Sequence, residues 1–351
     1  MTKILHTADV HLRSNRPERR DALAAVLSLA ADEAVDVVTI GGDLFDRPED
    51  VEELRTDLRN DLFRDRSFEV LLIPGNHDVA AYRENILFGD SCIVMLDEPF
   101  EHWTSPEGDV RVTGVPYRER PDDKFLLALK DREPFDGTEV LLLHCSLDAP
   151  FEDIETGAEE TGRYFPVTET LLADLGFDYY LAGHYHGPNV VSVGDDATFT
   201  YPGTPASTSE SETGRRIVSL LDPTDGIRTI PLDTFHYALK SVTVTPGSEQ
   251  TIIETLEKWA DRHAVDSTDA TVTVDGFIAM DETTFDERLS EAVKPATVRN
   301  ETRNVGQLQS HPLYQSFETE LAEMEWDDET RDAVRQRTLE VFSTLDAGGA
   351  I

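Results

Sequence analysis

Short hydrophobic runs that end in glycine or polar residues recur along the first two-thirds of the chain. They are rich in leucine and β-branched residues, as expected of strands buried on both faces of a sheet. The runs cover residues 3–9, 35–43, 69–78, 110–117, 139–146 and 177–186. Between several of them lie helical patterns, such as 17–34 and 49–65, with proline near the start and acidic residues in the first turn. This alternation predicts an α/β layered fold.

The last third of the chain has a different organisation. Short strands and turns occupy about 188–235, where DPTDG indicates a hairpin turn. A small α+β domain is predicted for residues 236–305. Its expected elements are strands at 238–246, 270–279 and 296–300 and helices at 249–263 and 285–293. Two further helices are predicted at 311–324 and 327–345. In the second, Val334, Leu339, Val341 and Phe342 share helical spacing, which indicates either a core face or a partner-binding face.

Composition excludes several classes of protein. An apolar fraction of 39% with 16 Phe and 9 Tyr in 351 residues excludes a disordered or fibrous chain. No apolar run approaches the roughly 18–20 residues of a membrane span, and the start of the chain does not resemble a signal peptide, so we expect a cytoplasmic protein without a membrane partner. Cys92 and Cys145 each lie in an apolar run and are expected to be reduced core residues.

The charge of the chain is extreme. It carries 70 acidic and 31 basic residues, a formal net charge of −39, and the basic residues are almost all arginine. An acidic, lysine-poor surface resembles that of proteins from a salt-saturated, halophilic cytoplasm, where self-repulsion is screened within about 3 Å at 1 M salt. In dilute buffer this charge argues against a nucleic-acid partner, but at molar salt that argument loses most of its force.

Polar residues with metal-binding chemistry end five of the predicted strands. They are Asp9 and His11; Asp43 with Asp46; Asn76, His77 and Asp78; His144; and His184 and His186. In an open α/β sheet, ligands bind outside the carboxyl ends of the strands. Carboxylate, amide and imidazole groups suit manganese, iron or zinc. Seven of these residues, two aspartates, one asparagine and four histidines, are counted as candidate ligands. Seven are too many for one catalytic ion with an open position, but they are about right for two ions that share a carboxylate.

Each of these elements is weak on its own. GNHD is equally well explained as a turn, and a lone His144 after a leucine run is more often a hydrogen-bonded core histidine than a ligand. GHxH is stronger, because alternate residues of a strand point the same way. The occurrence of all five elements in order, each at a strand end, makes a purely structural explanation improbable.

The ordered set DxH, GDxxD, GNHD, His and GHxH resembles the calcineurin-like metallophosphoesterase superfamily. Within it, KILHTADVHL, GGDLFDRPED and YPGTPASTSESETGRR are similar to the nuclease subunit of the Mre/Rad (bacterial SbcC–SbcD) DNA-break repair complex. The resemblance implies a layered β-sandwich flanked by helices over residues 1–235, which forms the nuclease domain. A capping domain over 236–305 and a helical segment over 306–351 that docks an SMC-like ATPase are also implied, together with a homodimer.

The resemblance also implies roles for single residues. One ion would take Asp9, His11 and His186; the other would take Asn76, His144 and His184; and Asp43 would bridge both. His77 would face the substrate and stabilise charge on the phosphoryl oxygen or protonate the leaving 3′-oxygen. Asp78 is interpreted as a partner that orients a histidine, with turn capping as the alternative. In many relatives, the position of Asp46 holds a histidine that is linked to the handling of duplex DNA ends. The resemblance therefore supports phosphodiester hydrolysis more strongly than exonuclease action on duplex ends.

Two weaker signals have structural alternatives. Arg13, Arg16, Arg19 and Arg20 follow the first motif and either face a phosphate backbone or form a solvated loop and helix start. Tyr185, inside GHYH, either stacks on a nucleotide or belongs to the core.

Taken together, the sequence favours a two-metal, manganese-dependent DNA exonuclease and endonuclease that repairs double-strand breaks with an SMC-like ATPase. A generic metallophosphoesterase acting on a small phosphodiester or phosphomonoester is the first alternative. A DNA- or partner-binding scaffold with a vestigial metal site is the second.

The charge leads to a prediction about stability. We expect the protein to lose structure at low salt, because screening of its acidic surface is then lost. The measurement is the melting temperature between about 0.1 and 3 M KCl. An unchanged melting temperature over this range would contradict adaptation to high salt.

Overall fold

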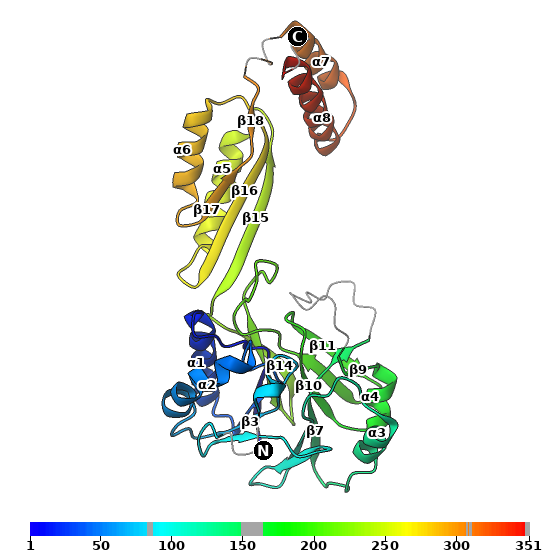
Figure 1. Ribbon diagram of the computed structural model, residues 1–351. Helices are drawn as coiled ribbons and strands as arrows, with labels where there is room; N and C mark the ends of the chain where they lie inside the picture. Colours follow the sequence, from blue (N-terminus) through cyan, green and yellow to red (C-terminus); the bar gives the residue numbers. More distant parts are fainter. Residues whose placement is uncertain (83–86, 149–163, 307, 309–310, 348–351) are drawn as a thin grey trace. The chain divides into compact units, whose positions relative to one another are not determined.

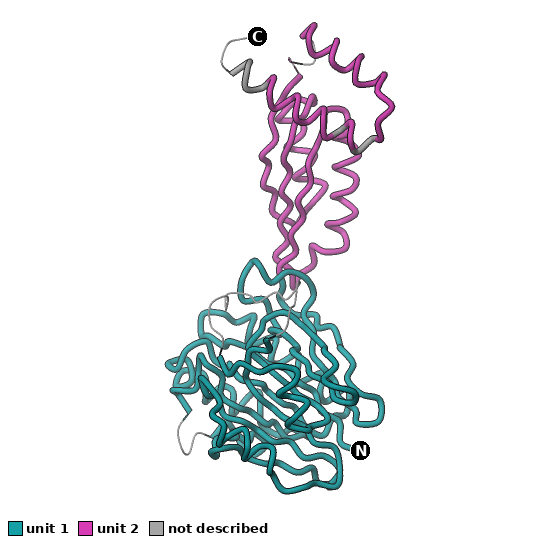
Figure 2. The backbone as a smooth tube through the Cα atoms, turned by 90° about the vertical axis from the view of Figure 1, so that its right-hand side faces the viewer, with its two compact units in different colours: residues 1–236 teal, residues 237–351 magenta. Residues whose placement is uncertain are grey.

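Two six-stranded sheets, built by the strand-and-helix alternation of the first two-thirds of the chain, lie face to face in Met1–His236 (Figure 1). The computed structural model describes residues 1–82, 87–148, 164–306, 308 and 311–347. Residues Tyr237–Ile351 form a second unit, shown in magenta in Figure 2. None of the helices in these described ranges is long and apolar enough to cross a membrane.

Parallel strands form the centre of both sheets. The first sheet has the order β14 (Gly226–Pro231), β13 (Ile217–Asp222), β1 (Ile4–Thr7), β2 (Val37–Ile40), β3 (Glu69–Leu72), β4 (Cys92–Val94). The second has the order β11 (Asn189–Val193), β12 (Ala197–Tyr201), β10 (Tyr179–Gly183), β7 (Thr138–His144), β6 (Val110–Gly114), β5 (Glu101–Thr104). Strands β1 to β4 are parallel to one another, as are β12, β10, β7 and β6. Their carboxyl ends therefore finish at common edges.

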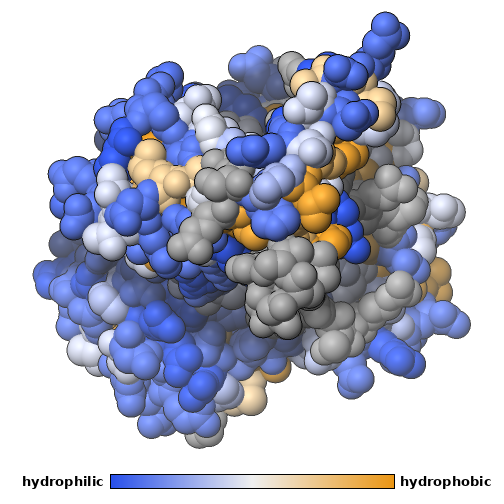
Figure 3. Space-filling view, turned by 90° about the horizontal axis from the view of Figure 1, so that it is seen from above, coloured by the Kyte–Doolittle hydropathy of each residue, from blue (hydrophilic) through white to orange (hydrophobic). Residues whose placement is uncertain are grey.

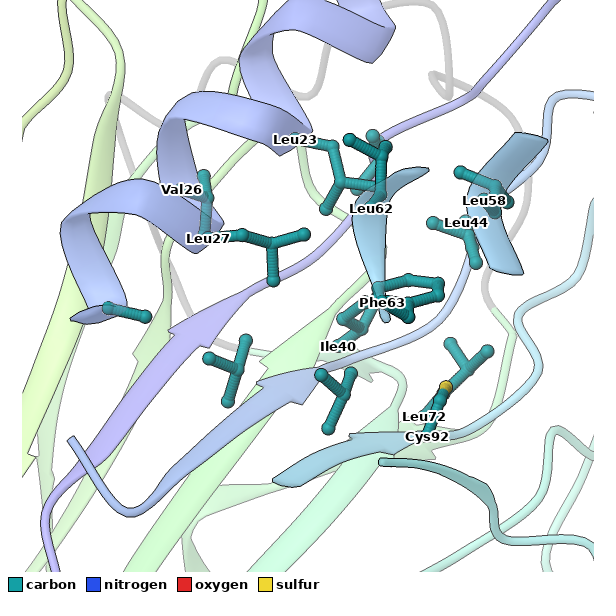
Figure 4. Packing of buried hydrophobic residues seen from close by; sticks show 14 of the residues in the cluster. Leu23, Val26, Leu27, Ile40, Leu44, Leu58, Leu62, Phe63, Leu72 and Cys92 are labelled. Atoms are coloured by element: carbon teal, nitrogen blue, oxygen red, sulfur yellow. The ribbon is translucent and has the colours of Figure 1, made fainter. Parts of the chain in front are cut away.

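Alternate side chains of these strands pack into different layers. On β1, Ile4 faces the core between the sheets, where it joins Leu142 of β7, whereas Leu5 faces outward. The outer face of the first sheet is covered by α1 (Pro17–Asp32) and α2 (Pro48–Asp57), and Figure 4 shows leucines of α1 over the strands. Helices α3 (Asp123–Lys130) and α4 (Glu169–Leu175) cover the second sheet. The predicted α/β layered fold with flanking helices is confirmed.

Several boundaries differ from those predicted. The helix expected over 49–65 ends at Asp57 and continues as a π-helical turn, η1 (Leu58–Leu62), which aims Leu58 and Leu62 at the core. Strands β4 and β5 and helices α3 and α4 were not individually predicted, because each is short and its pattern is weak. The hairpin turn at DPTDG is confirmed, since it joins β13 to β14.

The second unit contains the predicted smaller alternation of strands and helices. Its strands are β15 (His236–Val244), β16 (Thr268–Ile278), β17 (Thr297–Asn300) and the short β18 (Arg303–Asn304), and its helices are α5 (Glu249–His263) and α6 (Glu282–Ala292). Apolar residues of both helices, such as Leu256 and Phe285, pack against Val272 and Val274 of β16. Each predicted strand and helix of residues 236–305 is therefore present.

The terminal helices, α7 (Pro312–Glu323) and α8 (Asp328–Ala347), are also present. Leu339 is buried and, with Phe342, belongs to a cluster that includes Phe277 of β16 and Tyr314 of α7. Val341 is 51% exposed. The apolar stripe of α8 is thus divided between a core face and solvent.

The face of the molecule that Figure 3 shows is strongly polar. In Figure 3 hydrophilic residues occupy most of the visible face among the described residues, as the net charge of −39 requires. Cys92 and Cys145 are free and buried, which confirms their prediction as reduced core residues.

One buried histidine joins the two sheets. His6 of β1 lies between them, where its Nδ1 is 2.9 Å from Thr39 Oγ1 and its Nε2 is 3.1 Å from the carbonyl oxygen of Ala182 on β10. A neutral ring satisfies both contacts, with Nε2–H donating to the carbonyl and Nδ1 accepting from the hydroxyl. Burial lowers the pKa of His6 to about 4.

This burial predicts a pH-dependent stability. The pKa of His6 is lower in the folded chain than in the unfolded chain, so unfolding takes up a proton between about pH 6.5 and pH 4. The contribution of His6 to the free energy of unfolding is complete above pH 6.5 and falls by about 3 kcal/mol as the pH drops to 4. In urea unfolding, the stability difference between wild type and His6→Gln should therefore shrink as the pH falls. The exposed His263→Gln is the control, and a difference that does not change with pH would contradict the prediction.

Candidate metal centre

The carboxyl ends of five strands meet at one place in the first unit. Asp9 and His11 follow β1, Asp43 follows β2, Asn76 and His77 follow β3, His144 ends β7, and His184 and His186 follow β10. The two carboxylates and the four imidazoles of the predicted ligand set are 0–3% exposed, and Asn76 and His77 are half-buried. The two sheets thus deliver every predicted ligand to the same buried edge.

Three overlapping groups of side chains have the spacing that a metal ion needs. Within each group the candidate ligand atoms lie within 4.8 Å of one another, and the groups are Asp9, His11, His186; His11, Asp43, His77; and Asp9, Asp43, His144. Asn76 joins them through its Oδ1, which is 2.7 Å from His144 Nε2. The His184 ring lies 5.3 Å from that of His144, between ring centres. Asp9, His11 and Asp43 each belong to two of the groups, so the three groups form one connected cluster.

The hydrogen bonds at this edge favour a bound cation. His144 donates its Nδ1–H to the carbonyl oxygen of Gly41 at 2.8 Å, so in the neutral ring Nε2 carries a lone pair. That lone pair faces two further acceptors, Asn76 Oδ1 at 2.7 Å and Asp43 Oδ2 at 3.4 Å. Acceptors that face acceptors in a buried place are unfavourable unless a proton or a cation lies between them.

His186 is oriented by a hydrogen bond in a similar way on the other side of the site. His186 donates its Nδ1–H to Glu212 at 2.7 Å, and its Nε2 lies 3.1 Å from His11 Nε2. Burial and the neighbouring His186 hold the pKa of His11 well below its usual value, so the His11 ring is neutral at neutral pH and has one nitrogen lone pair to offer. The residues present therefore fit divalent cations that accept both oxygen and nitrogen ligands.

The backbone at this edge is held in conformations that side chains rarely adopt. Asp9, His11 and Asp43 have φ angles of 52°, 50° and 50°, and His184 has a φ angle of 117°. Such residues cost of order 1–3 kcal/mol each and cluster at functional sites. Close packing also explains one glycine of the motifs, because a Cβ on Gly75 would collide with the Asp43 carboxylate.

Asp78 closes the loop that carries Asn76 and His77. Its carboxylate accepts hydrogen bonds from the backbone N–H of Gly75 at 2.8 Å and of Phe45 at 3.1 Å, and from the Tyr82 hydroxyl at 3.2 Å. Burial and the nearby Asp43 raise its pKa to about 8. Among the described residues, the donors to Asp78 are thus two backbone N–H groups and a tyrosine hydroxyl rather than a histidine.

Asp46 contacts two histidines of the site, His77 and His11. Its carbonyl oxygen accepts from His77 Nδ1 at 3.1 Å, and its carboxylate lies 3.7 Å from His11 Nδ1. The first contact holds one proton of His77 on Nδ1, so Nε2 is the nitrogen that gains or releases the other.

Tyr185 is half-buried and lies beside both His184 and Tyr201, so its ring packs within the protein next to a candidate ligand.

One supporting residue escaped the sequence interpretation. Glu212 is fully buried, and its carboxylate accepts from His186 Nδ1 at 2.7 Å, from Thr204 Oγ1 at 2.9 Å and from the Thr208 N–H at 2.8 Å. Burial acts to raise its pKa, but the hydrogen bonds from His186 and Thr208 outweigh burial and lower it to about 2. The only signal in the sequence was its position in the YPGTPASTSESETGRR segment, 26 residues after His186.

Comparisons with known proteins place these features in context. Residues 2–188 match the family model of the calcineurin-like phosphoesterases. The chain is 28% identical over 237 residues to the DNA double-strand break repair protein Mre11 of Aeropyrum pernix, which covers 58% of this chain and 53% of that protein.

Two relatives come from Bacillus subtilis. The uncharacterized metallophosphoesterase YhaO is 27% identical over 284 residues, 71% of this chain and 65% of that protein. A subunit of the nuclease SbcCD is 26% identical over 264 residues, 64% of this chain and 67% of that protein. The chain thus spans about half to two-thirds of the length of these relatives.

The Glu212–His186 contact leads to a prediction about metal affinity. Glu212→Gln keeps the shape of the side chain but removes the charge that makes His186 a stronger ligand, so affinity for Mn²⁺ should fall by about 10–100-fold. Calorimetric titration with MnCl₂ measures this. Glu210→Gln, the same change at an exposed neighbour, should leave the affinity unaltered. Equal affinities for Glu212→Gln and wild type would show that Glu212 only stabilises the fold.

Proposed function

The chain belongs to the calcineurin-like phosphoesterase family, and from this premise we propose that it is a two-metal DNA phosphodiesterase that processes double-strand breaks as an exonuclease and endonuclease. The observation that carries the proposal is the convergence of buried acceptors from five strand ends, described above. The choice of DNA as substrate is supported by relatives whose names place them in DNA double-strand break repair and in a nuclease complex.

We assign the ligands in two sets. Asp9, His11 and His186 would hold one cation, Asn76, His144 and His184 would hold the other, and Asp43 would bridge them, with manganese as the expected metal. When bound, two such cations supply a nucleophile from water at neutral pH and neutralise charge on the phosphate. The hydrogen bonds from His144 to Gly41 and from His186 to Glu212 support this assignment, because each turns a lone pair toward the site.

His77 would act directly on the substrate. Its backbone N–H donates to Asp43 Oδ1 at 2.9 Å, and its ring is held through Nδ1 by the carbonyl oxygen of Asp46. A protonated His77 would donate from Nε2 to the leaving 3′-oxygen, or stabilise charge on the phosphoryl oxygen. His77 also has the spacing of a ligand beside His11 and Asp43, so metal content must be measured together with activity.

The second unit would serve substrate access and assembly. Residues 236–305 would form the capping domain that shapes access of DNA, and 306–351 would dock an SMC-like ATPase. Exposed apolar side chains on and beside α7 and α8 support the docking role: Leu313 (59% exposed), Met324 (43%), Trp326 (41%) and Val341 (51%). The name of the B. subtilis nuclease SbcCD relative places it in a complex with other chains. We also propose a homodimer.

His77→Ser tests the proposed function. Turnover should fall by about 10²–10⁴-fold, the usual contribution of a positioned acid or base, while metal content stays near that of the wild type. The substrates are a labelled single-stranded oligonucleotide, a duplex with free ends and bis-p-nitrophenyl phosphate, in MnCl₂ and about 2 M KCl. The exposed His263→Ser is the control.

Each outcome of this experiment has a separate meaning. Equal loss of metal and activity in His77→Ser would move His77 into the ligand set. Turnover of the small diester without any cleavage of DNA would favour the generic phosphoesterase. The cleavage rate of the duplex relative to the single strand would show whether duplex ends are processed with Asp46 at this position.

A further inference from the structure

The four arginines that follow the first motif have different partners. Arg16 lies 3.7 Å from Glu18, and Arg20 donates to Asp57 at 2.6 Å. Arg19 is buried and donates to the carbonyl oxygen of His11 at 2.6 Å and to Asp46 Oδ1 at 3.2 Å, so it supports the backbone of the metal centre and one oxygen of Asp46. Arg19 and Arg20 are therefore held by hydrogen bonds within the protein. Arg13 shares with Arg19 the acid Asp46 at the rim of the metal centre, but it lies beside the other carboxylate oxygen.

Arg13 and Arg47 meet at the same oxygen atom. Arg13 Nη1 is 3.6 Å and Arg47 Nε is 3.7 Å from Asp46 Oδ2. Both distances are too long for hydrogen bonds, and within the described residues neither guanidinium makes a hydrogen bond. Their side chains are 25% and 60% exposed. Two cationic groups therefore share one carboxylate oxygen, and neither engages its N–H donors in a hydrogen bond with the described residues.

The carboxylate of Asp46 connects this pair to the metal centre. The other oxygen of Asp46 is 3.7 Å from His11 Nδ1, and the Asp46 carbonyl oxygen holds the ring of His77. Asp50 is buried and interacts electrostatically with both arginines as well as with Asp46 and Glu53. In a chain with a net charge of −39, a paired cationic group at the rim of the site is a specific feature.

We infer that Arg13 and Arg47 bind a phosphate of the substrate strand that neighbours the phosphate being hydrolysed. Guanidinium groups bind phosphate through parallel N–H donors, and two of them beside one another match the two free oxygens of a phosphodiester. The inference rests on the proposed function. It makes the site selective for a polynucleotide strand, since a small diester with a single phosphate has nothing to place between these arginines.

Binding in the absence of metal separates this inference from catalysis. A fluorescent single-stranded oligonucleotide is titrated with protein in EDTA at several KCl concentrations, and anisotropy gives Kd. Arg13→Gln and Arg47→Gln should each weaken binding by about ten-fold, and each should lower the slope of log Kd against log [KCl] by about 0.7. Arg20→Gln, which removes an arginine paired with Asp57, is the matched control. Arg13→Lys should recover part of the affinity because it restores the charge.

Kinetics give an independent readout. In MnCl₂ the Arg13 and Arg47 variants should raise KM for the oligonucleotide by a larger factor than KM for bis-p-nitrophenyl phosphate, and melting curves establish that each variant folds. Equal increases for both substrates, or Kd values equal to that of the wild type, would overturn the inference while leaving the proposed function intact. A wild-type protein that neither binds nor cleaves the oligonucleotide would instead overturn the proposed function.

Discussion

The burial of two carboxylates and four imidazoles at one sheet edge is the interaction on which the rest of this structure depends. Asp9 and Asp43 are 0% and 1% exposed, and the lone pairs of His144 and His186 are turned into the site. Burial of charge is costly, so this edge is stable only when cations are held there or when the surrounding fold resists relaxation. Both the strained φ angles and the glycines of the motifs are consequences of the same close approach.

Residues that are not themselves candidate metal ligands hold the ligands of this edge in position. Glu212 holds His186, Asp78 closes the loop of Asn76 and His77, and the carbonyl oxygen of Asp46 holds His77. Each hydrogen bond selects one tautomer or one loop conformation, and ligands that are oriented in advance bind a metal more tightly. The layered sandwich provides the rigidity, because its strands are packed on both faces.

The charge of the whole chain and the chemistry of the site act in opposite directions. A net charge of −39 repels a polyanionic substrate, whereas the proposed reaction brings phosphate into the centre of the protein. Cations bound at the metal centre, and the arginines proposed to bind phosphate at its rim, would reverse that repulsion locally. Since salt screens long-range repulsion more than it weakens short contacts, a high-salt environment would leave these local attractions in control.

The α/β layering and the candidate ligands follow from the sequence, because strands buried on both faces read as apolar runs and their carboxyl ends are marked by Asp, Asn and His. Asp9, Asp43 and His186 are therefore candidate ligands on the sequence alone. The hydrogen-bond partners of such residues cannot be predicted in this way. Glu212 reaches His186 across 26 positions, and the four arginines after the first motif divide among Glu18, the His11 carbonyl, Asp57 and Asp46. Local patterns carry periodicity and residue type, but a hydrogen-bond partner depends on how distant segments are packed, and only the tertiary structure decides that.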